Sequence, residues 1–197
     1  MVPYVRKSFK KHWNNGVKYI GKPSGRFPRH WENITTDLPI TEYPDYDDCA
    51  GVYYYAMDMT KREIYQAAEG LYHNLNTLQS RSGNQLPFTS INYGTCTLLE
   101  GRMITEALLN VSIEGLGKNK KTSIFPCGIF QVMKGVNKEP GTPNYDLYRL
   151  ALRSTAQRLY PNYANVDWSG NIGYDRNDPR TYFSTMGKRK LSPFKIF

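Results

Sequence analysis

The stretch QLPFTSINYGTCTLLEGRMITEALLNVSIEG, residues 85–115, contains the two patterns that decide the fold. Residues 85–93 follow a cluster of turn formers and predict an extended strand, with Pro87 near its start because proline cannot donate to a ladder. Residues 100–114 predict a helix that ends before a glycine and carries its apolar side chains on one side, at Met103, Ile104, Ala107, Leu108 and Val111. A strand followed by a one-sided helix is the building unit of α/β folds.

The same alternation extends in both directions from this stretch. Residues 52–79 repeat apolar groups at the i, i+3, i+4, i+7 spacing of a helix that faces a core. Downstream, the sequence predicts a strand over 123–132, a helix over 145–159 and a short strand over 163–168. The order helix, strand, helix, strand, helix, strand favours parallel βαβ crossovers, with functional groups at the carboxyl ends of the strands.

The two ends of the chain have a different character. Residues 1–19 place Val5, Phe9, His12 and Trp13 at a helical spacing and predict a short amphipathic helix that needs a partner surface. Residues 21–49 are rich in glycine, proline and turn formers and predict a long irregular connection. After Tyr182 the chain is short and basic, and it shows no clear period.

Composition restricts the class of protein. A chain of 197 residues with 40% hydrophobic content, 16 Tyr and 8 Phe can fill the core of one domain. No apolar run approaches the ~20 residues of a membrane helix, and a secretory signal is lacking, so we expect a cytoplasmic protein without a membrane partner. The three cysteines lack CxxC spacing, and we expect neither a disulfide framework nor a metal site.

The formal charge of +9 raises the question of a nucleic-acid partner. Residues 1–31 hold eight Lys and Arg and no acid, and residues 179–197 hold five and no acid. The segment between them holds the remaining 13 bases and all 17 acids. Because the excess lies at the two ends and not along a folded face, we expect no nucleic-acid partner.

Four long blocks resemble the catalytic subunit of the anaerobic (class III, glycyl-radical) ribonucleoside-triphosphate reductases. They cover most of residues 55–187 and agree with that family in order and spacing, and residues 1–20 are also similar to it. The blocks are YAMDMTKREIYQAAEGLYHNLNTLQSRSGNQLPFTSINYGTCTLLEGRMITEALL, EGLGKNKKTSIFPCGIFQVMKGVN, NYDLYRLALRSTAQRLYPNYANVDWSGN and DPRTYFSTMG.

The resemblance implies a fold and an activity. The family forms a ten-stranded α/β barrel that reduces ribonucleoside triphosphates for DNA synthesis, by abstracting the ribose 3′-hydrogen with a thiyl radical. The radical originates on a glycine that a radical-SAM activating enzyme oxidises, formate is the usual reductant, and bound nucleotides act as effectors. The glycyl-radical and zinc segments of the family have no counterpart in these blocks, so we expect no cofactor bound to this segment.

The resemblance also suggests residues that contact substrate. Ser90, Asn92, Thr95 and Cys96 lie where a predicted strand gives way to a loop, which is the usual position of substrate-binding groups in an α/β barrel. Simpler interpretations remain: Asn92 satisfies a turn, and Cys96 is either a second active-site thiol or an ordinary loop residue. Asn162 either shapes the barrel lumen or only ends a helix.

A finger loop inside the barrel presents the radical cysteine in this family, in the sequence Met-Gly-Cys-Arg. Here Met186 and Gly187 are followed by Lys188 and Arg189, so a lysine takes the position of the cysteine. Because an ammonium group has no weak S–H bond, we expect this chain to be inactive on its own. Met186 and Gly187 remain candidates for substrate contact.

These observations divide the chain into an N-terminal helix with its connection (1–51), a partial reductase barrel that ends at the finger loop (52–189), and a divergent tail (190–197). We expect a truncated or frameshifted product, or else one piece of a split enzyme that pairs with a complementary segment. Open barrel edges also predict self-association. The alternative function is a non-catalytic nucleotide-binding or oligomerising module derived from the reductase.

Overall fold

The computed structural model describes residues 1–21, 50–77 and 88–168, and beyond them isolated positions and short runs between 175 and 192. The expected irregular connection therefore lies outside the described residues, apart from its first position. The helices and strands, in chain order, are α1 (Val2–Ile20), α3 (Ala50–Thr77), β1 (Ser90–Tyr93), α4 (Leu99–Glu114), β2 (Cys127–Val132), α5 (Tyr145–Arg158), β3 (Asn162–Asn165), β4 (Ser184–Met186) and β5 (Lys188–Ser192).

Strands β1, β2 and β3 form a parallel sheet in that order, with α4 and α5 as the crossover connections. The predicted α/β class and the parallel crossovers are confirmed. The strands are shorter than predicted: β2 begins only after Pro126, and β3 begins directly after Pro161, one residue before the predicted start, but ends three residues before the predicted end. A proline has no N–H to donate, so the ladder begins at the residue that follows it. Strand β3 ends at Asn165, whose Oδ1 accepts a hydrogen bond from the backbone N–H of Asp167 in a turn.

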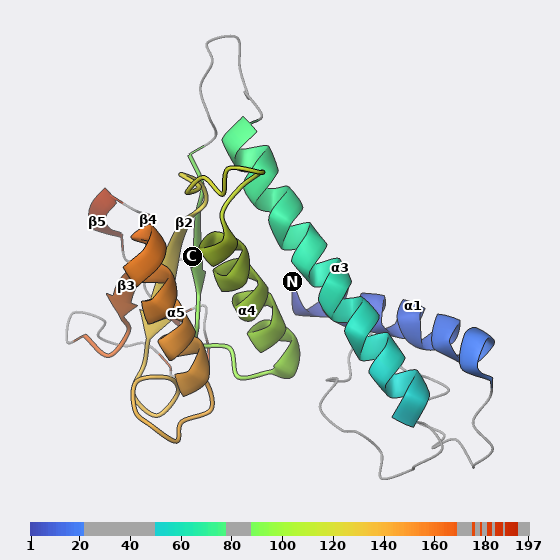
Figure 1. Ribbon diagram of the computed structural model, residues 1–197. Coiled ribbons are helices and arrows are strands. Elements are labelled where there is room, and N and C mark those ends of the chain that lie inside the picture. Colours follow the sequence, from blue (N-terminus) through green and yellow to red (C-terminus); the bar gives the residue numbers. More distant parts are fainter. Residues whose placement is uncertain are drawn as a thin grey trace.

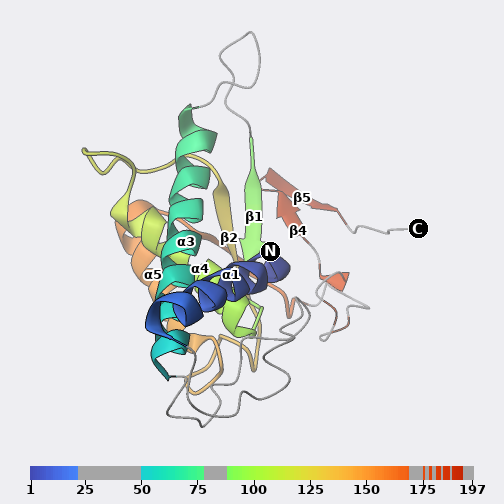
Figure 2. The ribbon, with the colours of Figure 1, turned by 90° about the vertical axis from the view of Figure 1, so that its right-hand side faces the viewer.

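Helices α3, α4 and α5 lie on the same side of this sheet. Figure 1 shows α5, α4 and α3 side by side, with α1 beyond α3. Figure 2 shows these helices on one side of β1 and β2 and the β4–β5 hairpin on the other. On the helix side, Tyr93, Phe130 and Tyr163 are neighbours across the three strands, and Phe130 packs against the buried Leu109 and Ala151.

Helix α1 packs against α3. Val5, Phe9 and Trp13 are buried against Val52 and Ala56, so the predicted amphipathic helix is confirmed. Burial of side chains of this size stabilises the pair by roughly 1.5–3 kcal/mol each, before the cost of ordering the chain. Further along α3, a second stretch of apolar side chains turns towards α4, with Ala68 and Tyr72 packed on Ala107, Leu108 and Val111.

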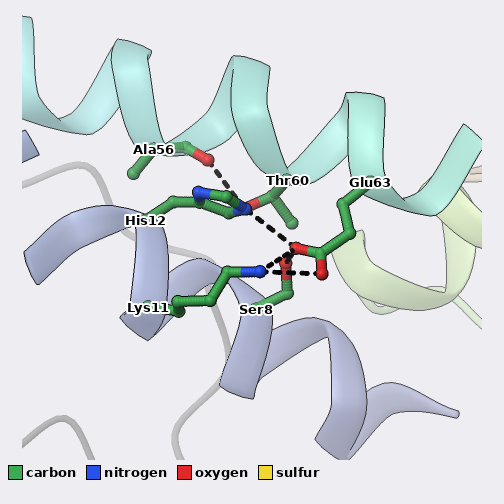
Figure 3. A network of polar contacts seen from close by, with 6 residues as sticks. All are labelled: Ser8, Lys11, His12, Ala56, Thr60 and Glu63. Carbon is green, nitrogen blue, oxygen red and sulfur yellow. Dashed lines mark hydrogen bonds and ion pairs between the residues drawn. The ribbon is translucent and has the colours of Figure 1, made fainter. Parts of the chain in front are cut away.

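A polar network closes the α1–α3 contact at its edge (Figure 3). The carboxylate of Glu63 accepts hydrogen bonds from the Lys11 ammonium at 2.8 and 2.9 Å and from the Ser8 hydroxyl at 2.5 Å, and His12 Nε2 lies 2.8 Å from it. The Lys11 ammonium first, and then the Ser8 hydroxyl, lower the pKa of Glu63 to about 2. The network therefore links three residues of α1 to one carboxylate of α3.

Strands β4 and β5 pair antiparallel, with Met186 opposite Lys188. The sequence shows no clear period in this region. Strands of three and five residues are too short to show a reliable alternation, and it is the pairing of the two strands that defines them. Strand β5 continues through Ser192, beyond the division expected at 189.

Candidate functional site

The face of the sheet opposite the helices carries three of the predicted site residues. Side chains alternate along a strand, and Tyr93, Phe130 and Tyr163 point to the helices, so Asn92, Ile129 and Asn162 point the other way. The register makes these three residues one row, because Asn92 pairs with Ile129 and Ile129 pairs with Asn162. Two strand spacings separate the asparagines by about 10 Å.

Ser90 lies on the same face, two residues before Asn92, and pairs with Cys127. Burial raises the pKa of the Cys127 thiol, which favours its protonated form. The structure thus brings Ser90, Asn92 and Asn162 onto one face of the sheet. This face offers neutral hydroxyl and amide groups, which can both donate and accept hydrogen bonds.

The loop after β1 leaves the sheet through Gly94, whose φ of +117° is unfavourable for a residue with a side chain. A Cβ there would lie 3.1 Å from Phe130 ring carbons and from the carbonyl oxygen of Gln131. Thr95 follows, and its hydroxyl lies 3.5 Å from the side-chain oxygen of Gln131. Thr95 is therefore held beside a strand residue that points to the face opposite the helices.

Cys96 takes a different direction from the other predicted residues. Its side chain lies over Gly101 in the first turns of α4, where a Cβ on that glycine would come within 2.3 Å of the sulfur. Cys96 is exposed, and the carbonyl oxygen of the same residue accepts a hydrogen bond from Asn144. The structure places Cys96 at the end of the Gly94–Cys96 loop, with its side chain directed to α4 and not to the helix-free face.

The β4–β5 hairpin lies on the helix-free side of the sheet, with β4 against β1. Met186 and Lys188 are opposite each other at its turn, and their side chains, like the whole of Gly187, lie outside the described part of the structure. Nearby, the Tyr182 hydroxyl lies 3.8 Å from the sulfur of Met133, just after β2. The described backbone at Met186 and Lys188, on either side of Gly187, thus lies on the same side as Ser90, Asn92 and Asn162.

Sequence reasoning missed three residues around this surface: Gln131, Asn137 and Asn144. Gln131 is buried within an apolar strand, and Asn137 and Asn144 are fully buried although they lie in a segment rich in glycine and proline, residues 135–144. An asparagine in such a segment is normally read as part of a turn. The signal that could have found them is weak, because only the fold brings them to the loop after β1.

A hollow of about 680 Å³ lies between α1, α3 and α4, lined mainly by apolar side chains such as Tyr4, Ala67 and Leu71, and no predicted site residue lines it. Within the described residues, no three His, Cys, Asp or Glu side chains are grouped to hold a metal ion. None of the described helices has both the length and the apolar composition needed to cross a bilayer.

A parallel sheet with helices on one face, and with Ser90, Asn92 and Asn162 on the other, defines an α/β protein whose candidate site lies on the helix-free side. The chain belongs to the anaerobic ribonucleoside-triphosphate reductase family, because the family model matches residues 1–192. The resemblance found in the sequence is thereby confirmed.

Individual relatives carry the same name. Over 113 residues the chain is 42% identical to the anaerobic ribonucleoside-triphosphate reductase of Escherichia coli strain K12. The aligned part covers 57% of this chain and 16% of that protein. It is 40% identical over 113 residues to the reductase of Haemophilus influenzae, with the same coverage. Against the reductase of Enterobacteria phage T4 it is 41% identical over 107 residues, or 54% of this chain and 18% of the relative. The matched part spans less than a fifth of each of these curated relatives.

Proposed function

We propose that this chain forms one wall of the ribonucleotide site of an anaerobic ribonucleoside-triphosphate reductase. The observation that carries the proposal is the row of Asn92, Ile129 and Asn162 on the helix-free face, with the β4–β5 hairpin on the same side. Ser90 and Thr95 add hydroxyl groups near this row. Sugar hydroxyls and nucleobase edges are recognised by groups of this kind, which donate and accept hydrogen bonds without carrying charge.

The wider architecture of the proposal is the family's ten-stranded α/β barrel. A sheet in the order β1–β2–β3, with every crossover helix on one face, has the arrangement of a barrel sector. A doubly wound sheet would have helices on both faces. Within the described residues β1 and β3 each have one strand neighbour in the sheet, so both edges can accept further strands from a complementary reductase segment or from self-association.

The proposed substrate is a ribonucleoside triphosphate, and the proposed setting is deoxyribonucleotide synthesis in the cytoplasm. The family's glycyl radical, its activating enzyme, formate and nucleotide effectors belong to the complete enzyme. Lys188 stands where the family has its radical cysteine, and an ammonium group cannot accept a hydrogen atom from the sugar. We therefore propose that this chain holds the substrate and does not itself carry out the reduction.

Calorimetric titration of the full chain with ATP, CTP, GTP and UTP tests the binding role. Asn162→Ala removes an amide from the proposed wall, and Asn165→Ala, in the same strand but with its side chain on the opposite face, is the matched control. Loss of one such hydrogen bond costs about 1 kcal/mol of binding free energy, so we expect N162A to bind nucleotide about fivefold more weakly and N165A to bind it as the unchanged chain does. Equal affinities of both variants and the unchanged chain would reject the proposed surface.

The alternative, a nucleotide-binding module without any part in turnover, predicts the same binding. The position of Lys188 favours it, and anaerobic activation of this chain mixed with the remainder of a family enzyme separates the two. Deoxynucleotide formation in the mixture supports a wall of a working site, and its absence with every remainder tested supports the module.

A further inference from the structure

Two asparagines with no assigned role lie beneath the loop that joins β1 to α4. Asn137 and Asn144 are both 0% exposed, and the side-chain nitrogen of each donates to the carbonyl oxygen of Gly94 at 3.0 Å. Asn144 also donates to the carbonyl oxygen of Cys96 at 2.9 Å. One loop of three residues thus receives three side-chain hydrogen bonds from a segment more than 40 residues away in sequence.

The remaining polar atoms of Asn137 are also used. Its nitrogen donates to the carbonyl oxygen of Gln131 at 2.8 Å, and its oxygen accepts from the backbone N–H of Met133 at 2.9 Å. The amide therefore ties the end of β2 to the end of β1. Because each of its groups is buried and paired, replacing it leaves several polar atoms without partners, which is far costlier than losing one surface contact.

Asn144 is at the N-terminal cap of α5, where an asparagine normally accepts hydrogen bonds from the first backbone N–H groups of its own helix. Here it makes no such cap. Its side-chain oxygen accepts from Arg102 Nη1 at 2.7 Å, while the nitrogen reaches the loop after β1. The side chain is thus directed at the loop and not at its own helix.

Arg102 orients this amide from the side of α4. Its guanidinium also donates to the carbonyl oxygen of Pro143 and to the carboxylate of Asp146, the latter at 2.6 Å. Because an arginine guanidinium only donates hydrogen bonds, the side-chain oxygen of Asn144, and not its nitrogen, must face Arg102. The nitrogen of Asn144 is consequently left to face the two loop carbonyl oxygens.

We propose that Asn137 and Asn144 are positioning residues that hold the Gly94–Cys96 loop in place, so that Thr95 is presented to the ribonucleotide. The proposal rests on the function proposed above and adds residues outside the surface that contacts substrate. Gly94 also supports this loop conformation. Its positive φ and the lack of space for a Cβ favour glycine at the position whose carbonyl oxygen accepts from both amides.

Asn144→Asp in the full chain is the decisive variant, because aspartate keeps the acceptor for Arg102 and loses both donors to the loop. The backbone order parameters of residues 94–97, from ¹⁵N relaxation, report whether the loop is held. We expect values near 0.85 in the unchanged chain and below about 0.6 in N144D, together with about a tenfold weaker Kd for the best-binding nucleoside triphosphate. Ser154→Ala, a fully buried change on α5 that does not touch the loop, is the control for a general loss of stability.

Arg102→Lys is a milder variant in case N144D does not fold, since a lysine keeps the charge but loses the fork that orients Asn144. It should lower the same order parameters by a smaller amount. A loop that stays as rigid in the folded variant as in S154A would overturn the positioning role. A loosened loop with unchanged nucleotide affinity would overturn its link to the ribonucleotide. If the unchanged chain binds no nucleotide, the function proposed above fails, while the order parameters still decide whether the asparagines hold the loop.

Discussion

Glu63→Gln should weaken the contact between α1 and α3 in a pH-dependent way. The pKa of Glu63 is lowered from 4.5 to about 2. Taken at face value, that shift corresponds to roughly 3 kcal/mol of stability. The Glu63 side chain is 44% exposed, however, so solvent screening reduces the expected contribution to about 1 kcal/mol. Glutamine keeps the shape and the hydrogen-bonding oxygen but loses the charge that Lys11 pairs with.

The sign follows from the direction of the shift. A carboxyl group whose pKa is lower in the folded state contributes stability that is fully present above pH 4.5 and lost as the pH falls towards 2. Urea unfolding of the full chain at pH 7 should therefore show Glu63→Gln about 1 kcal/mol less stable, and the difference should shrink steadily below pH 4.5. Glu106→Gln, on an exposed position of α4, is the control and should change stability by less than about 0.5 kcal/mol. A difference between Glu63→Gln and the unchanged chain that is the same at pH 7 and pH 3 would refute the role of the charge.

Two further predictions concern packing. Leu109→Ala should lower the free energy of unfolding by about 3 kcal/mol, because the Leu109 side chain is 0% exposed between Phe130 and α5. Leu152→Ala, at a position that is 45% exposed, should lower it by less than about 1 kcal/mol; urea midpoints measure both, and equal losses would contradict the packing described. Gly70→Ala should stabilise α3 by about 0.5–1 kcal/mol, because a Cβ at this position meets nothing within 4 Å. Gly101→Ala should destabilise the chain and displace the Cys96 side chain, because its Cβ would lie 2.3 Å from the Cys96 sulfur, and a stabilising effect would show that Cys96 does not depend on this glycine.

The helices were predictable because their apolar side chains recur at a period that does not depend on what they pack against. Helix α4 runs from Leu99 to Glu114 against a predicted 100–114, and α5 from Tyr145 to Arg158 against 145–159. The strand that became β2 was predicted too long, since Ile124 and Phe125 extend its apolar run into a segment that lies before the paired residues Cys127–Val132. Strand length depends on hydrogen bonding to a neighbour, which the local sequence does not specify.

The candidate site was only partly predictable. Ser90 and Asn92 were proposed because they lie near the end of the predicted strand 85–93, and Asn162 because it follows a helix stop beside the next strand. The expected position at the carboxyl ends of strands is wrong for Ser90 and Asn162, which are the first residues of β1 and β3, because the backbone pairing starts later in β1 and earlier in β3 than predicted. Their common face depends on the register of β1, β2 and β3, which the sequence leaves open. Asn137 and Asn144 were missed because their significance lies in contacts with Gly94 and Cys96, more than 40 residues earlier in the chain.

The sequence alone determined the α/β class, the order of helices and strands from α3 to β3, and membership of the reductase family, because local periodicity and long shared blocks carry that information. Only the tertiary structure decided that all the crossover helices lie on one face, that Asn92 and Asn162 share the other, and that two buried asparagines hold the loop between β1 and α4. The reason is physical: register and buried hydrogen bonds join residues far apart in sequence, and those pairings exist only once the chain has packed.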